Sequence, residues 1–160
     1  MTTFRQGQQG GRYPPPNPSP TQTAYPVGYL QGSYFDDKGV IKCELLTTRA
    51  EQLAKTFGNA GIASTQLRQF FVQVRSIERQ IGQRQFAELI PRIQRLSALV
   101  AYFAGRGKSP DERNKREIFK RFIDENRVIA EKIEKNFKLG FVPHFEAIVA
   151  YYKFYFPGKD

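Results

Sequence analysis

The chain has 160 residues, which suits a single domain with one hydrophobic core. Its 25 lysine and arginine residues outnumber 15 aspartate and glutamate residues, and the net charge of +10 favours a polyanionic partner such as a nucleic acid or an anionic membrane surface. A single cysteine, Cys43, excludes an intrachain disulfide and an intrachain thiolate metal cluster, and no apolar run is long enough to span a bilayer. We therefore expect a soluble, cytoplasmic protein.

The first 33 residues are rich in Gln, Gly, Pro, Thr and Tyr, and they contain two arginines but no acidic residue. A segment of this composition cannot bury enough apolar surface to offset the entropy lost on ordering. We predict a disordered tail over residues 1–33 and a folded helical bundle over residues 34–160.

The folded part is expected to open with a turn at Asp36-Asp37-Lys38-Gly39, where the paired carboxylates have no third metal ligand nearby in the sequence. A first helix is predicted from Thr48, because Thr48 and Glu51 have the spacing of a capping box. Gly58 and Gly61 are expected to end this helix.

A second helix is predicted from Ser64 or Thr65 to Gly82. At 100° per residue, its apolar side chains occupy one face, and Arg68, Arg75 and Arg79 follow one edge of that face within about 40° of one another. Four glutamines take the opposite flank: Gln66, Gln69, Gln73 and Gln80.

A third helical region is predicted from about Arg84, and Pro91 either kinks it or starts a separate helix. Beyond Pro91, the side opposite the apolar stripe carries a second basic stripe, which consists of Arg92, Arg95, Tyr102 and Arg106. Gly105 and Gly107 are expected to end the helix and to leave Arg106 and Lys108 in an exposed basic turn. The segment from Ser64 to Lys108 has eight basic and two acidic residues, so it carries +6 of the chain's +10.

Ser109-Pro110-Asp111-Glu112 is a strong helix start, with a capping serine, a proline at the first helical position and a capping-box glutamate. The surface of this helix mixes both signs of charge, which is typical of an ordinary solvated face. The last helix, from about Val142 to Phe156, is apolar almost all round, so it should lie centrally or be covered by another chain. The predicted fold is an all-α, single-domain bundle of about five to six helices.

Nothing in the sequence indicates catalysis. His144 is the only histidine, it lies far from Cys43 in the sequence, and both are in apolar surroundings, so a core or interface histidine is the better interpretation. The nucleotide-binding and zinc-protease motifs are missing from the sequence, and Gly105-Arg106-Gly107-Lys108 does not open a helix in a βα unit. We expect no enzymatic activity, no cofactor and no bound metal.

Three interpretations of the arginine stripes remain open. They could contact the sugar-phosphate backbone of a nucleic acid, since the planar guanidinium binds phosphate bidentately. They could instead pair with acidic patches of neighbouring proteins in a helical scaffold or adaptor. A membrane-surface helix would need an exposed apolar face beside the charges, whereas these apolar faces are needed for the core.

Four segments carry a family resemblance: Gly39–Thr47, Ser64–Phe71, Leu99–Arg106 and Phe145–Phe154. In this order and spacing, they resemble the small helical subunit of type III-A CRISPR–Cas effector complexes, the Csm complex. The resemblance extends from about Tyr34 to Phe156 and leaves the Pro-rich tail outside.

The resemblance implies a non-catalytic, antiviral RNA-binding subunit that stacks in several copies along the crRNA-bound backbone subunits. It implies that basic surfaces hold the target RNA or the crRNA–target duplex, and that the backbone and large subunits of the Csm complex and other copies of the chain are its protein partners. It does not imply a membrane partner. Arg68 and Arg106 are the basic positions that match the family's motifs, whereas Arg75, Arg79, Arg92, Arg95 and Lys108 are predicted to bind RNA from helical geometry alone.

Overall fold

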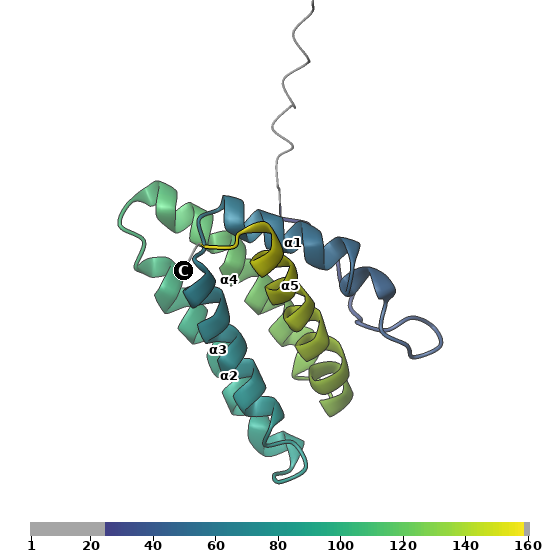
Figure 1. Ribbon diagram of the computed structural model, residues 1–160. Coiled ribbons are helices and arrows are strands. Elements are labelled where there is room, and N and C mark those ends of the chain that lie inside the picture. The colour runs from purple at the N-terminus through teal and green to yellow at the C-terminus, as the bar shows by residue number, and fades with distance from the viewer. Residues whose placement is uncertain (1–24, 159–160) are drawn as a thin grey trace, which may run out of the picture.

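The computed structural model describes residues 25–158, and within them the chain forms five α-helices (Figure 1). A short 3₁₀ turn, η1, and a π-helical segment, η2, complete the secondary structure, and the described residues contain isolated β-bridges but no strand. The all-α prediction is therefore confirmed. The elements are η1 (Cys43–Leu45), α1 (Thr48–Asn59), α2 (Ser64–Glu78), α3 (Phe86–Gly105), α4 (Pro110–Ala130), η2 (Asn136–Phe141) and α5 (Val142–Tyr155).

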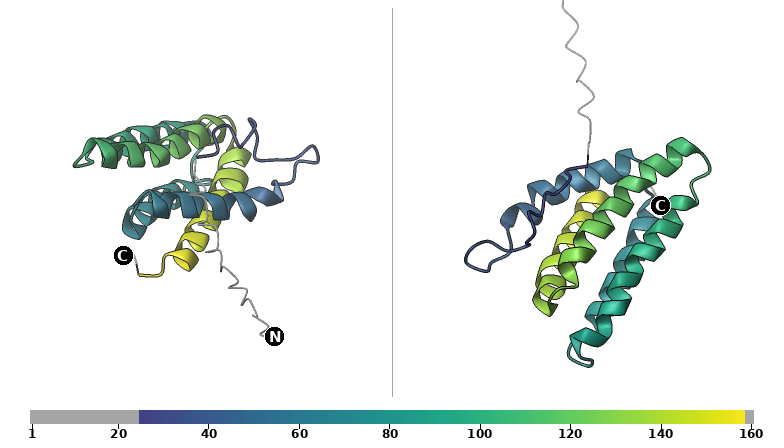
Figure 2. Two further views of the ribbon diagram at one scale, coloured as in Figure 1. Left: turned by 90° about the horizontal axis from the view of Figure 1, so that it is seen from above. Right: turned by 180° about the vertical axis from the view of Figure 1, so that it is seen from behind.

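The helices α3 and α4 form an antiparallel pair, and α1 lies across one end of the bundle at an angle to the other helices (Figures 1 and 2). A cluster of phenylalanines fills the space between the helices. Phe57 of α1 lies with its ring centroid 5.2 Å from that of Phe119 and 5.3 Å from that of Phe122, both on α4. Phe145 of α5 lies 5.3 Å from Phe122. These four rings are fully buried, so one aromatic core joins α1, α4 and α5.

The helix starts follow the sequence signals to different degrees. Ser109 caps α4 as predicted, because its Oγ accepts a hydrogen bond of 3.1 Å from the Glu112 amide. The predicted capping box at Thr48 is wrong: the N-cap residue is Thr47 without a side-chain cap, and the Glu51 carboxylate instead accepts a hydrogen bond from Lys55. The helix α3 starts at Phe86 and continues through Pro91. The helical segments on the two sides of this proline therefore belong to one helix.

The N-terminal boundary of the fold differs from the prediction. Tyr25, Tyr29 and Leu30 are buried in the core, although they belong to the predicted tail. The Tyr25 hydroxyl donates a hydrogen bond of 2.8 Å to the Glu125 carboxylate on α4. The predicted boundary after residue 33 therefore falls too late in the chain, while residues 1–24 of the predicted tail lie outside the described residues.

The last helix is not covered uniformly. Five side chains of α5 are buried in the core: Val142, His144, Phe145, Ile148 and Tyr152. Phe154, near its end, is 74% exposed. Ile133, which lies just beyond the end of α4 at Ala130, is also exposed. The helix α5 thus packs in the core along one face as far as Tyr152, while Phe154 in its last turn is open to solvent.

Candidate nucleic-acid interface

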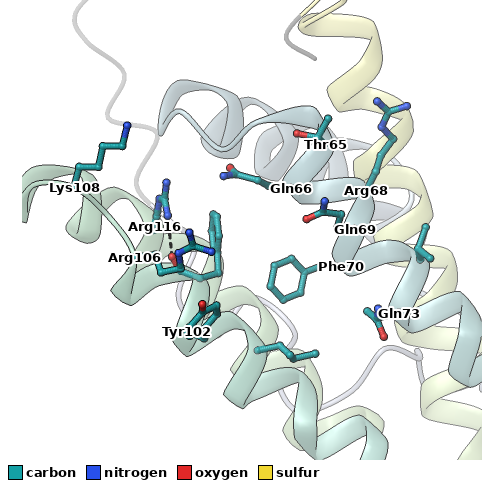
Figure 3. Close-up of a pocket in the computed structure, with 13 residues that line it drawn as sticks. Thr65, Gln66, Arg68, Gln69, Phe70, Gln73, Tyr102, Arg106, Lys108 and Arg116 are labelled. Atoms are coloured by element: carbon teal, nitrogen blue, oxygen red, sulfur yellow. Dashed lines mark hydrogen bonds between the residues drawn. The ribbon is translucent and has the colours of Figure 1, made fainter.

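The helices α2 and α3 and the start of α4 surround an open hollow of about 900 Å³ (Figure 3). Its floor is aromatic, since Phe70 of α2 and Phe103 of α3 meet there with ring centroids 5.9 Å apart. The lining residues are Thr65, Gln66, Arg68, Gln69, Phe70, Val72, Gln73, Leu99, Tyr102, Phe103, Arg106, Lys108 and Arg116.

A second hollow of about 170 Å³ continues between the same two helices. Gln73 and Leu99 line both hollows, so the two adjoin. The second hollow is lined by Gln73, Ile77, Arg92, Arg95, Leu96 and Leu99. We call the two hollows together the α2–α3 groove.

The wall that α3 contributes is the predicted basic stripe. Arg92 and Arg95 line the smaller hollow, and Tyr102 and Arg106 line the larger one. Tyr102 is 67% exposed, and the guanidinium carbon of Arg106 lies 5.5 Å from the centre of its ring. Lys108, just beyond the helix, lines the same hollow. The structure thus brings the predicted α3 residues together along one groove.

The wall that α2 contributes differs from its predicted basic edge. Gln66, Gln69 and Gln73 line the groove, and of the α2 arginines only Arg68 does so. Arg75 and Arg79 line neither hollow, and the Arg75 guanidinium forms an ion pair of 2.6 Å with Glu78 on its own helix. The glutamine flank of α2 therefore faces α3, while most of its arginine edge lies outside the groove.

Arg116 of α4 is a groove residue that the sequence analysis did not single out. Its Nη1 donates a hydrogen bond of 2.9 Å to the Phe103 carbonyl, and its Nη2 pairs with Glu112 at 2.6 Å. Its guanidinium also lies 4.6 Å from the centre of the Phe103 ring. These contacts fix one positive charge at the end of α3, where the helix dipole is negative. The only sequence signal was the Glu112–Arg116 spacing of four residues, which is common on solvated helices.

The charge of the groove has one sign. Among residues 25–158, no aspartate or glutamate lines either hollow. Glu112 does not line the groove but contacts two residues that do, Arg116 and Lys108, and the hydrogen bond from the Lys108 amide lowers the pKa of this carboxyl. A concave surface lined by arginines and lysine without carboxylates attracts anions, and its guanidinium groups are suited to phosphate.

His144 lies away from the groove, in the core, and is not available for catalysis. Its Nδ1 donates a hydrogen bond of 2.6 Å to the Leu45 carbonyl, so Nε2 is the acceptor for the Tyr29 hydroxyl at 2.5 Å. Burial lowers the pKa of His144 from 6.5 to about 4, which keeps the ring neutral at physiological pH. Cys43, by contrast, is exposed on η1. The prediction of a core histidine is confirmed.

The described residues contain neither a metal site nor a membrane-spanning helix. Over residues 25–158, no group of three or more His, Cys, Asp and Glu side chains could hold a metal ion. The helices in this range also lack the length and apolar character needed to cross a bilayer.

Comparison with known proteins identifies the family. The family described as Csm2 Type III-A matches residues 41–158 of the chain. The chain belongs to this family. Neither the curated proteins nor the solved structures contain a match to it.

Membership of the Csm2 family makes the chain a small subunit of a type III-A CRISPR–Cas effector, the Csm complex, as the resemblance implied. Subunits of this family are generally non-catalytic structural components, and they assemble with the other subunits of the complex. The matched range contains all five α-helices and the whole α2–α3 groove, and it begins after the N-terminal segment at residues 25–40.

Proposed function

We propose that this Csm2-family subunit is a non-catalytic RNA-binding component that holds target RNA, or the crRNA–target duplex, through the α2–α3 groove. The observation that carries the proposal is the lining of the groove: five basic side chains from α3, the following turn and α4, without a carboxylate among the described lining residues. These five are Arg92, Arg95, Arg106, Lys108 and Arg116.

The length of the basic wall fits a short stretch of a strand. Arg92 on α3 and Arg106 at the C-cap of this helix are fourteen residues apart, which corresponds to about 21 Å along the helix axis. At about 3.4 Å per nucleotide of a stacked strand, this length spans about six phosphates. Since guanidinium groups bind phosphate oxygens and not base edges, we expect binding that depends strongly on salt and little on sequence.

Stacking of several copies in the Csm complex would place several such grooves along one RNA. Each groove then adds to the binding without a new contact, because the first engaged copy raises the effective concentration of the next. We therefore propose that the partners of the subunit are the RNA, the backbone and large subunits, and other copies of the chain. Together they act in antiviral defence in the cytoplasm.

The test removes three groove charges and compares them with three charges elsewhere. The groove variant carries Arg92→Gln, Arg95→Gln and Arg106→Gln, and the control carries Arg121→Gln, Lys132→Gln and Lys138→Gln, which are exposed and line neither hollow. Both variants lower the net charge by the same amount. RNA affinity is measured by fluorescence anisotropy for the full chain and for the reconstituted Csm complex, at several salt concentrations.

We expect the groove variant to bind RNA at least about tenfold more weakly than the control and to have a salt slope that is shallower by about two. Helical circular dichroism should remain unchanged in both variants. Equal losses in the two variants would mean that only net charge matters. If the groove variant failed to assemble but bound RNA normally, the groove would be a protein-binding surface, as in the scaffold interpretation.

A further inference from the structure

The larger hollow of the α2–α3 groove has features that phosphate binding does not require. An exposed tyrosine stands on one wall, two glutamine amides stand on the other, and aromatic side chains form the floor (Figure 3). We propose that this hollow holds an unpaired nucleobase of the bound RNA, with Tyr102 as its stacking platform. The inference rests on the proposed RNA binding and adds a base subsite to it.

Tyr102 is placed to offer a ring face. Its side chain is two-thirds exposed, and Arg106, one helical turn further on, lies over the ring at 5.5 Å. A guanidinium at this distance interacts favourably with the ring and restricts its orientation. Base–aromatic stacking tolerates every base, because each has a π face, so this platform fits an RNA-binding surface without sequence preference.

Gln69 and Gln73 supply polar groups on the opposite wall. Both are exposed residues of α2, and within the part of the chain that the structure describes neither amide forms a hydrogen bond. Each amide offers one acceptor and two donor hydrogens, which can meet the edge of a stacked base in more than one arrangement. Gln66 is different, since its Oε1 already accepts a hydrogen bond of 3.0 Å from the Ala63 amide.

The floor and the size of the hollow complete the subsite. Phe70 and Phe103 provide an apolar surface on which a flat ring can lie, and Arg106 and Lys108 stand where the phosphates on either side of the base could be bound. A hollow of about 900 Å³ is within the range of small-molecule sites and exceeds what one base needs. A base in a duplex could enter only after leaving its partner, so the occupant is an unpaired or extruded nucleotide.

The first test is a photochemical cross-link in the reconstituted Csm complex. Single-stranded RNA that contains 5-iodouridine is bound and irradiated, and the cross-linked peptide is found by mass spectrometry after trypsin digestion. We expect the label on the peptide of residues 96–106, which contains Tyr102. Cross-links confined to peptides outside the groove would overturn the inference.

The second test separates stacking from charge. Tyr102→Ala should weaken binding of uridine-rich RNA about five- to hundredfold, whereas Tyr102→Phe should retain affinity within about twofold because the ring remains. Phe154→Ala, which removes another exposed aromatic side chain away from the groove, is the matched control and should have no effect. On RNA whose bases are replaced by abasic residues, Tyr102→Ala should cause no further loss, since the base it stacks on is already missing.

The outcomes distinguish the subsite from the proposed function. If the groove arginines prove essential but Tyr102→Ala leaves binding unchanged, the base subsite is wrong and RNA binding by the groove stands. Equal weakening of normal and abasic RNA by Tyr102→Ala would also overturn the subsite. If neither the arginines nor Tyr102 matter, both proposals fail.

Discussion

The Tyr29 hydroxyl donates a hydrogen bond of 2.5 Å to Nε2 of His144, although the two residues are 115 positions apart in the chain. On its other side the His144 ring donates from Nδ1 to the Leu45 carbonyl at 2.6 Å. Nδ2 of Asn126 donates to the Tyr29 hydroxyl at 3.1 Å, and the Tyr34 hydroxyl donates to Oδ1 of Asn126 at 2.8 Å. This buried chain of hydrogen bonds connects the N-terminal segment, η1, α4 and α5.

Acid should weaken the fold through His144. Because its folded pKa, about 4, is below the ordinary 6.5, the unfolded chain binds more protons than the folded chain between these two pH values. The contribution of His144 to the free energy of unfolding should therefore be complete above pH 6.5. It should fall as the pH drops towards 4, by up to about 1.4 kcal/mol per pH unit and about 3 kcal/mol in all. Urea unfolding at several pH values from 7.5 to 5 measures this decline.

The same series on a His144→Gln variant serves as the control. His144 is the only histidine in the chain, so its replacement should flatten the pH dependence of the free energy of unfolding between pH 6.5 and 5, whatever it does to stability as a whole. A wild-type free energy of unfolding that stays constant over this interval would contradict the assignment of a buried neutral imidazole.

The segment at residues 25–33 should contribute to stability as part of the core. Leu30 is 2% exposed and Val27 is 66% exposed, so the two residues offer a matched comparison within one turn-rich segment. Leu30→Ala should lower the free energy of unfolding by about 3 kcal/mol, since it removes buried apolar atoms and leaves a cavity, whereas Val27→Ala should change it by less than about 0.5 kcal/mol. Chemical denaturation of the full chain measures both, and similar effects of the two variants would mean that this segment does not dock in solution.

Local signals in the sequence were sufficient for the helices but not for this segment. The start of α4 is specified by neighbours in the sequence, since Ser109 caps the amide of Glu112 three residues later. Tyr25 and Tyr29 instead find their partners, Glu125 and His144, about a hundred positions away, and no local pattern carries that information. Composition therefore predicted one uniform tail where part of the segment belongs to the core.

The candidate site was predictable to a similar degree. Helical periodicity places Arg92, Arg95, Tyr102 and Arg106 on one side of α3, and these residues do line the groove. The periodicity of α2 gives the angle between its arginine edge and its glutamine flank, but not which of the two faces α3. That choice depends on how the helices pack, which a single-helix pattern does not contain. Arg116 joins the groove for the same tertiary reason.

The stability of the fold should be sensitive to the addition of a single methyl group at Gly140. A Cβ at this position would lie 2.5 Å from two ring carbons of Tyr34, which is fully buried and held by its hydrogen bond to Asn126. Gly140→Ala should therefore lower the free energy of unfolding by about 2 kcal/mol. Gly105→Ala is the control, because nothing lies within 4 Å of its Cβ, and it should raise stability by about 0.5 kcal/mol. Urea unfolding distinguishes the two variants. An unchanged free energy of unfolding for Gly140→Ala would show that the Tyr34 ring can move aside.

The two arginine stripes should differ in their effect on RNA binding. Arg92 and Arg95 line the groove, whereas Arg75 and Arg79 lie outside it and Arg75 is held by Glu78. Replacing either pair by glutamine removes two positive charges, so long-range attraction is lowered equally and only direct contacts differ. We expect Arg92→Gln/Arg95→Gln to weaken RNA binding to the assembled complex about tenfold and Arg75→Gln/Arg79→Gln to weaken it about twofold. Fluorescence anisotropy at fixed salt measures both, and the reverse order would place the RNA along the outer edge of α2 instead of in the groove.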